Sequence, residues 1–233
     1  MAVALIVAAG RGERLGLDRP KALVPLRGRP MLDYSLEALR AVAAVERIVV
    51  ALPAAALDAV PEGVVAVAGG LQRSHSVRAA LAAAPGAAQE AVIVHDAARP
   101  LCSAALFAQA LDALDRAPEA DAVIAAAPVT DTIKEVSDDG RSVARTLDRT
   151  RLWAVQTPQV FRRAALERAL GEASDELLAR ATDDAWLIER AGGVVHVLGS
   201  DPGNLKVTTA HDLRVAELLL AERAESARAG VGG

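Results

Sequence analysis

Residues 8–15 read Ala8-Ala9-Gly10-Arg11-Gly12-Glu13-Arg14-Leu15, and Pro20-Lys21 closes the stretch. It follows Val3-Ala4-Leu5-Ile6-Val7, an apolar run typical of a strand that is buried on both faces of a parallel sheet. Small residues and glycines after such a strand let the backbone approach a ligand, and free N–H groups suit phosphate oxygens. Because the stretch also carries two arginines and a lysine, it predicts a site for a nucleotide polyphosphate.

Two better-known glycine loops do not fit this stretch. A dinucleotide-binding fingerprint has glycine at its first, third and sixth positions, but here the sixth position is Leu15. A P-loop continues Gly-Lys with Ser or Thr, whereas Pro20-Lys21-Ala22 stands here. The alternative is an ordinary turn with basic residues on the surface. The place of the stretch, after a buried strand and before a helix, favours a ligand site, because open α/β sheets bind ligands at the carboxyl ends of their strands.

Length, composition and charge limit the classes of protein. The 233 residues are enough for one α/β domain with a substantial core. Although 52% of the residues are hydrophobic, no uninterrupted apolar run reaches the ~20 residues needed to span a bilayer. The formal charge of −4 argues against broad binding to nucleic acid or to an anionic membrane, but a local cluster of cations can still bind a small polyanion. Cys102, the single cysteine, is interpreted as a small buried hydrophobic residue. Because no signal-peptide pattern precedes the first strand and a single cysteine suits a reducing compartment, we expect a cytoplasmic protein.

Buried strands alternate with helical patterns along the rest of the chain. We expect strands at residues 47–52, 63–68, 91–94, 121–128, 152–161 and 194–198, and helices at 31–42, 77–84, 103–116, 163–171, 182–191 and about 210–225. This alternation predicts an α/β fold with a Rossmann-like, mostly parallel sheet flanked by helices. We expect one domain over residues 1–226 and a flexible tail at 227–233, where the sequence is rich in alanine and glycine.

Residues 129–150 break this pattern. Apolar and polar residues alternate on both sides of the turn Ser137-Asp138-Asp139-Gly140, which is typical of a β-hairpin. A hairpin has little core of its own, so we expect an arm that protrudes from the sheet and packs against a second subunit.

Two more strand ends carry polar residues. Gly69-Gly70 is followed by Ser74 and Ser76, which suit a base and its ribose; the alternative, which the residues alone favour, is a turn with Ser74 as a helix cap. His95-Asp96-Ala97-Ala98-Arg99-Pro100 follows another buried strand, and its carboxylate and guanidinium suit hydroxyls, a metal or a phosphate. The alternative here is an ion pair between Asp96 and Arg99.

Several short motifs occur in order over nearly the whole chain. They are Ala-Ala-Gly-x-Gly-x-Arg with Pro-Lys, His-Asp-Ala-Ala-Arg-Pro, Asp-Thr-x-Lys, Asp-Arg, Gln-Thr-Pro-Gln-x-Phe, Thr-Asp-Asp and Lys-Val-Thr. The first motif is common to many nucleotidyltransferases, but the ordered set is much more specific. On these motifs the chain resembles the 2-C-methyl-D-erythritol 4-phosphate cytidylyltransferases of the non-mevalonate isoprenoid pathway.

The resemblance implies a fold of nucleotidyltransferase type, a homodimer and a reaction. CTP and 2-C-methyl-D-erythritol 4-phosphate would give 4-diphosphocytidyl-2-C-methyl-D-erythritol and pyrophosphate, with Mg²⁺ or another divalent cation. Mg²⁺ would be held mainly by the CTP phosphates, with no protein ligand assigned. The acceptor's phosphate is already a nucleophile, so in-line positioning and charge neutralisation should carry the reaction.

The resemblance also implies a role for each matching residue. Arg14 and Lys21 would stabilise the transition state. The CTP-binding residues would be Ala8, Ala9, Gly10, Gly12, Gly70, Ser76 and Lys206. The residues that position the acceptor substrate would be Asp96, Arg99, Thr132, Arg149, Thr157, Thr182 and again Lys206. Thr132 and Arg149 lie on the arm, which in the family crosses to the partner subunit.

One departure and two rival functions remain. Leu71 stands where some members carry an acidic residue, which puts a ribose contact there in doubt. The first rival is a related nucleotidyltransferase with another phosphate acceptor, which would not be expected to share the Asp-Thr arm and the Gln-Thr-Pro-Gln segment. The second is a regulatory nucleotide-binding protein without catalysis, against which Arg14, Lys21 and Lys206 together argue.

Overall fold

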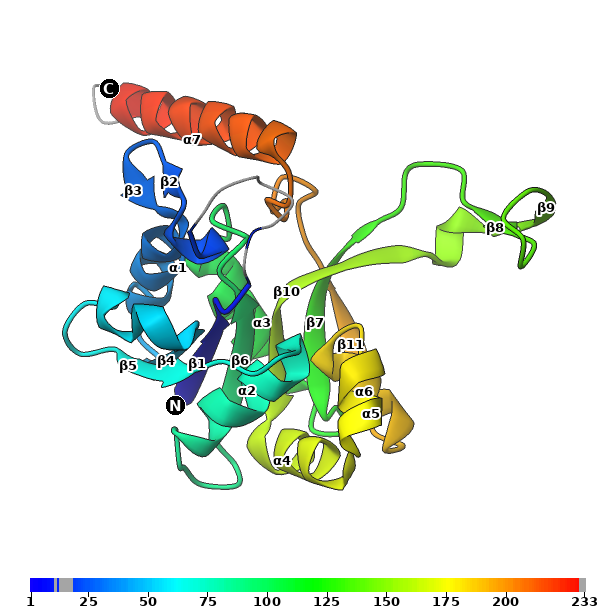
Figure 1. Cartoon of the computed structure of the whole chain (residues 1–233), viewed down its shortest axis with the longest axis horizontal. Helices are drawn as coiled ribbons and strands as arrows, with labels where there is room; N and C mark the ends of the chain where they lie inside the picture. Colours follow the sequence, from blue (N-terminus) through cyan, green and yellow to red (C-terminus); the bar gives the residue numbers. More distant parts are fainter. Residues whose placement is uncertain (11, 13–18, 231–233) are drawn as a thin grey trace.

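The computed structural model describes residues 1–10, 12 and 19–230, with side chains up to residue 226. A seven-stranded sheet with the order β11-β7-β10-β6-β1-β4-β5 forms its centre (Figure 1). All of its strands run parallel except β10, which is antiparallel to both of its neighbours. The strands are β1 (Ala2–Val7), β4 (Val45–Leu52), β5 (Val65–Ala68), β6 (Ala91–Asp96), β7 (Ala122–Pro128), β10 (Trp153–Arg162) and β11 (Val195–Gly199).

Helices cover both faces of this sheet because its central strands are apolar on both sides. Along β1, Ala4 and Ile6 belong to one core and Val3 and Leu5 to the other. The first core contains α1 (Met31–Arg40) and α3 (Ala104–Arg116). The second contains α2 (Arg73–Ala82), α4 (Arg163–Glu172), α5 (Asp175–Arg180) and α6 (Asp184–Arg190). The predicted α/β fold, with a mostly parallel sheet between helices, is thereby confirmed.

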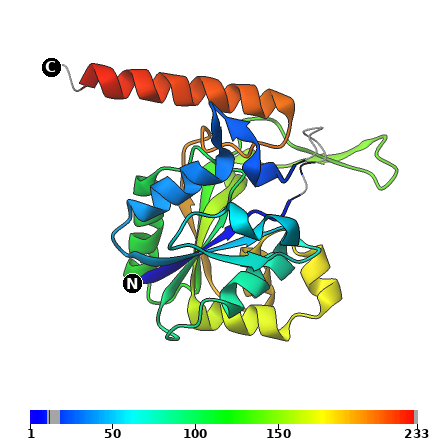
Figure 2. The same ribbon diagram turned by 60° about the vertical axis from the view of Figure 1, so that its left-hand side comes forward.

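A third, smaller core closes one end of the molecule. The helix α7 (Ala210–Gly230) lies across the small hairpin of β2 (Pro25–Leu26) and β3 (Arg29–Pro30), as Figure 2 shows. Its Ala216 is buried with Leu26 and Val207. Short 3-10 helices complete the described elements: η2 (Lys21–Leu23), η3 (Ala54–Ala59) and η4 (Arg149–Arg151). No helix in the described ranges is both long and apolar enough to cross a membrane.

The predicted hairpin projects from the body as an arm (Figure 1). Its strands β8 (Lys134–Val136) and β9 (Val143–Thr146) pair only with each other, and every residue in them is exposed. Val136 and Val143 are 52% and 60% exposed, respectively. The arm therefore has apolar side chains without a core to bury them.

Two expectations differ from the structure. Helix α5 was not predicted, because six residues are too few for a helical repeat to stand out; its Ser174 cap accepts a hydrogen bond from the backbone N–H of Leu177. Helix α7 runs to Gly230, beyond the expected end at about residue 225, so the segment assigned to a flexible tail begins as helix. The rest of that tail, residues 231–233, lies outside the described residues.

Candidate active site

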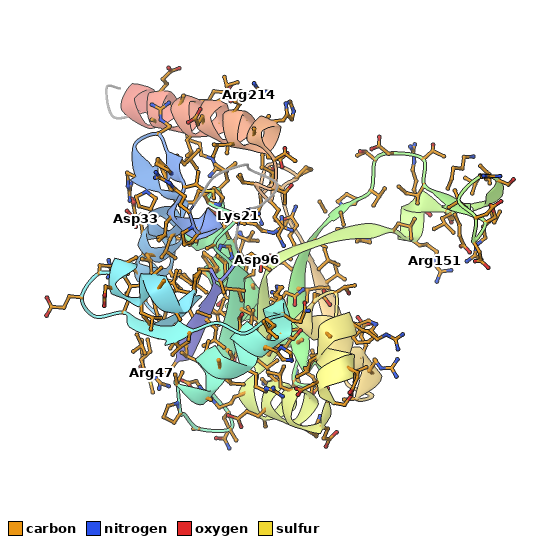
Figure 3. The ribbon with its side chains drawn as sticks, in the orientation of Figure 1. Lys21, Asp33, Arg47, Asp96, Arg151 and Arg214 are labelled. Carbon is orange, nitrogen blue, oxygen red and sulfur yellow. The ribbon has the colours of Figure 1, made fainter. Side chains whose placement is uncertain are left out.

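A cavity of about 990 Å³ opens at the carboxyl ends of β1, β4, β5 and β6. Three of its described lining side chains are cationic, namely Lys21, Arg73 and Lys206, and one is a carboxylate, Asp96. Figure 3 shows Lys21 and Asp96 at this end of the sheet, while Arg151 lies far out on the arm. The excess of positive charge and the exposed backbone of several glycines suit a small polyanion. The further described lining residues are Val7, Ala8, Ala9, Gly10, Gly12, Ala22, Pro53, Ala54, Gly69, Gly70, Leu71, Gln72, Ser76, Ala97, Ala98 and Thr208.

The loop after β1 brings Lys21 back to the strand end. The backbone N–H of Lys21 donates to the carbonyl of Gly10 at 3.0 Å, and that of Ala8 donates to Ala51 at 2.8 Å. Gly12 has a φ of +75°, and a Cβ there would lie only 3.2 Å from the Cβ of Lys21. The positive φ strongly favours glycine at this position, and the close approach lets the loop and Lys21 share one wall of the cavity.

The loop after β5 packs tightly against the first one. A Cβ on Gly69 would lie 2.3 Å from the Cβ of Ala9, and a Cβ on Gly70 would lie 2.3 Å from the Cβ of His75. The Ser76 hydroxyl accepts from the backbone N–H of Gly70 at 3.1 Å and donates to the carbonyl of Gln72 at 3.2 Å. Ser76 therefore fixes the shape of this loop from within helix α2.

Asp96, at the end of β6, is held by two cations. Its Oδ1 accepts from the Nε of Arg73 at 2.9 Å, and its Oδ2 pairs with the Nζ of Lys206 at 2.6 Å. Burial would raise the pKa of the Asp96 carboxyl, but the positive charges of Arg73 and Lys206 outweigh it and hold the pKa well below its usual range. Asp96 is therefore ionised at neutral pH, and both of its oxygens already have partners.

Behind Asp96, buried polar residues support the strand end. The Thr157 hydroxyl accepts from the backbone N–H of Asp96 at 3.1 Å and lies 3.0 Å from the Nδ1 of His95. Burial lowers the pKa of His95 to about 3, so its ring is neutral. Arg99 donates to the carbonyls of Asn204 at 2.7 Å and Val155 at 3.2 Å, and burial lowers its pKa. Arg99 and Thr157 thus brace the site and are not among its lining residues.

The structure brings together most of the predicted site residues from distant parts of the sequence. Nine of them line one cavity: Ala8, Ala9, Gly10, Gly12, Lys21, Gly70, Ser76, Asp96 and Lys206. Thr182 is exposed before α6 and is not among the described lining residues, and neither are Thr132 and Arg149 on the arm. Arg14, predicted to stabilise the transition state, lies outside the described residues.

Sequence reasoning missed two charged residues of this region. Arg73 lines the cavity and bonds to Asp96, and its Nη1 also donates to Asp184 at the start of α6. The Thr-Asp-Asp motif contained Asp184, but its position suggested only a favourable charge in the first turn of a helix. Arg73 stands three residues after Gly70, and no sequence pattern singled it out. Leu71, in contrast, was noticed, and it lies at the cavity with 92% of its surface exposed.

The described residues offer few side chains that could hold a metal ion. In the part of the chain that the structure describes, no group of three or more His, Cys, Asp or Glu side chains is placed to hold an ion. Asp96 is the single carboxylate among the described lining residues. This donor set fits a Mg²⁺ ion that keeps most of its ligands from phosphate oxygens and water, since Mg²⁺ commonly uses one or two protein carboxylates beside substrate phosphates.

Comparison with known proteins gives consistent matches over nearly the full length. A family model described as 2-C-methyl-D-erythritol 4-phosphate cytidylyltransferase matches residues 2–222. An enzyme of that name from Nocardia farcinica is 46% identical over 228 residues, covering 95% of each chain. One from Prochlorococcus marinus is 44% identical over 227 residues, covering 94% of this chain and 98% of the other. A crystal structure of the Thermus thermophilus enzyme superposes with a TM-score of 0.78 at 33% identity, covering 95% of this chain and all of that one.

Proposed function

Because the chain belongs to the 2-C-methyl-D-erythritol 4-phosphate cytidylyltransferase family, we propose that the cavity at the ends of β1, β4, β5 and β6 is its active site. The enzyme joins CTP to 2-C-methyl-D-erythritol 4-phosphate in the non-mevalonate pathway of isoprenoid synthesis, giving 4-diphosphocytidyl-2-C-methyl-D-erythritol and pyrophosphate. One observation carries the assignment of the site: two glycine loops and two lysines, Lys21 and Lys206, line the same cavity.

The proposed reaction is an in-line displacement at the α-phosphorus of CTP. A phosphate oxygen of the acceptor forms the new P–O bond while the bond to the pyrophosphate breaks. Because that oxygen is already ionised and nucleophilic, no general base is needed. Negative charge builds on the α-phosphate and the departing pyrophosphate. Lys21 and Arg14 would stabilise that charge, and the backbone of residues 8–12 would hold the triphosphate. Their positions around a glycine-rich strand end support this role for the described members, Lys21 and the loop backbone.

CTP and the acceptor substrate would be bound mainly by different groups of residues. Gly70 and Ser76 would bind the cytosine, since both line the cavity and the hydrogen bond between them holds their loop in one shape. Asp96 would bind hydroxyls of the acceptor while Lys206 holds its phosphate and a CTP phosphate. Arg99, Thr157 and Thr182 would complete this half; the first two lie buried next to Asp96, which supports a bracing contribution.

The CTP phosphates would mainly hold a divalent cation such as Mg²⁺, which would supply positive charge that offsets theirs. Among the described lining residues Asp96 is the only carboxylate, which supports an ion that is held mainly by substrate oxygens. We also propose a cytoplasmic location, supported by the buried free thiol of Cys102, which is typical of a reducing compartment.

We further propose that the active enzyme is a homodimer joined through the arm. The exposed Val136 and Val143 on the arm, and Trp153 and Val155 at its root, support burial against a second copy. Thr132 and Arg149 would then reach the partner's cavity, although in one chain they do not line it.

Pyrophosphate release tests the reaction. We would offer the acceptor and a panel of sugar and alditol phosphates with CTP, ATP, GTP and UTP, with and without Mg²⁺. Release only with CTP, the methylerythritol phosphate and a divalent cation is expected. Release with another pair would keep the chemistry but change the substrate, and binding of CTP without release would favour a regulatory protein.

A complementation experiment tests the arm. Lys21→Ala and Arg149→Ala, each expected to be inactive or weak alone, would be co-expressed so that mixed dimers form. If arms cross, one of the two sites in a mixed dimer has an intact Lys21 and an intact Arg149, so activity returns. If arms stay with their own body, every site keeps one lesion and activity stays low.

A further inference from the structure

Arg73, the first residue of α2, lies between two carboxylates that come from distant parts of the chain. Its Nε donates to Asp96 at the end of β6, and its Nη1 donates to Asp184 at the start of α6. The Asp184 carboxylate is fully buried, whereas the side chain of Arg73 keeps 21% of its surface exposed and lines the cavity. Arg73 therefore links the interior to the wall of the active site.

Stability alone is a weak explanation for this arrangement. Burial raises the pKa of Asp184 despite the positive charge of Arg73, so keeping its carboxylate ionised costs free energy. The Oδ1 of Asp184 and the Nη2 of Arg73 are also buried without a hydrogen-bond partner among the described residues. Buried ion pairs of this kind often contribute little to stability compared with apolar residues of the same size.

The link fixes the direction in which Asp96 faces. Arg73 holds one carboxylate oxygen of Asp96 and Lys206 holds the other, so rotation of the carboxylate would break both contacts. Asp184 in turn keeps the guanidinium of Arg73 in place through a second edge of the same planar group. If Arg73 moved, the Asp96 carboxylate would lose one of its two partners and could turn. The Lys206 ammonium, which pairs with that carboxylate, would then move with it.

We propose that Arg73 is a positioning residue for the acceptor substrate. Anchored by Asp184, it fixes the carboxylate of Asp96 and, through it, the ammonium group of Lys206 at the cavity wall. This inference rests on the acceptor-binding role proposed above for Asp96 and Lys206. The plain alternative is that Arg73 only ties α2 to α6.

Asp184→Asn is the most informative variant, because Asp184 does not line the cavity and the change removes a charge with little change of shape. We expect the KM for the methylerythritol phosphate to rise about tenfold, the scale for weakening one hydrogen bond to a charged group. The KM for CTP should rise less than the KM for the acceptor, because Lys206 is only one of several groups proposed to hold CTP. Arg73→Lys should raise the acceptor KM as well, because an ammonium cannot reach both carboxylates as a planar fork does.

The matched control is Arg78→Met on the same helix. Arg78 pairs with Asp175 at 3.1 Å on the surface and is not among the described lining residues. It should leave both KM values unchanged. Combining Asp184→Asn with Arg73→Lys should raise the acceptor KM no further than Arg73→Lys alone, because the two residues act as one unit.

Melting temperatures, measured beside the kinetics, separate the two readings. If Asp184→Asn and Arg73→Lys lower the melting temperature but leave the acceptor KM of the folded enzyme unchanged, the link is structural and the proposal is wrong. Asp96→Asn tests the premise: an unchanged acceptor KM there would remove the role of Asp96 itself. An effect of Asp96→Asn without any effect of Asp184→Asn and Arg73→Lys would keep the proposed site and reject only the positioning role.

Discussion

Gly69→Ala should damage catalysis through one added methyl group. The new Cβ would lie 2.3 Å from the Cβ of Ala9, whereas ordinary contact begins at 3.4 Å, so the two loops must separate by about 1 Å. Neither atom belongs to a flexible side chain that can turn away. Both loops line the cavity, and a misplacement of about 1 Å can cost about 100-fold in rate, so we expect kcat/KM for CTP to fall on that order.

The assay is steady-state pyrophosphate release at varied CTP, with two companion variants. Gly171→Ala in α4 is the control, because a Cβ there meets nothing within 4 Å; its kinetics should not change. Adding Ala9→Gly to Gly69→Ala removes the atom that is struck and should recover much of the loss, leaving a milder contact of 3.0 Å with the Ser76 hydroxyl. A single variant with kcat/KM near normal, or a double variant no better than the single one, would refute the packing argument.

Three other outcomes follow from the site. Lys21→Ala should lower turnover by about two powers of ten or more, the scale for losing one electrostatic stabiliser, and near-normal turnover in the same assay would remove Lys21 from the mechanism. Arg149→Ala should raise the KM for the acceptor more than that for CTP; equal effects on both would contradict its assignment. The pKa of His95 is about 3 in the folded chain against 6.5 unperturbed, so the unfolded chain takes up the proton first as the pH falls. His95 therefore has no effect on the pH dependence of the free energy of unfolding above pH 6.5. Between pH 6.5 and pH 3 it lowers this free energy by about 1.4 kcal/mol for each pH unit of acidification. Denaturant unfolding of wild type and His95→Gln across that range should show a shallower pH dependence in the variant, and identical slopes would mean that His95 is not buried in its neutral form.

The sequence was informative where the physical cause is local. The apolar residues 3–7, followed at once by glycines, predicted a buried strand and a ligand loop, and β1 ends at Val7 against the cavity. The change to period-two alternation after residue 128 predicted the hairpin, which β8 and β9 form. Backbone geometry and side-chain alternation depend on neighbours in the chain, so they can be seen in one sequence.

The missed features depend on tertiary contacts. Arg73 and Asp184 are 111 residues apart, and only the packing of α2 and α6 on the same face brings them together. Arg99 and Thr157, which are predicted to position the acceptor, are both buried beside Asp96 in the single chain, and this depth could not be predicted from the sequence. Short motifs gave the identity of these residues but not the depth at which each one lies.

The irregular pairing within β10 divides the strand into two parts with different surroundings. Its register against β7 is interrupted between Val155 and Gln159, and Asn204 fills the gap by donating to Gln156 at 2.8 Å and to the carbonyl of Thr157 at 2.9 Å. Before the interruption residues 153–155 are exposed and pair with the end of β7, and after it residues 156–161 are buried. A substitution at the exposed start of β10 should therefore disturb the fold less than one in its buried half, which carries Thr157 beside Asp96.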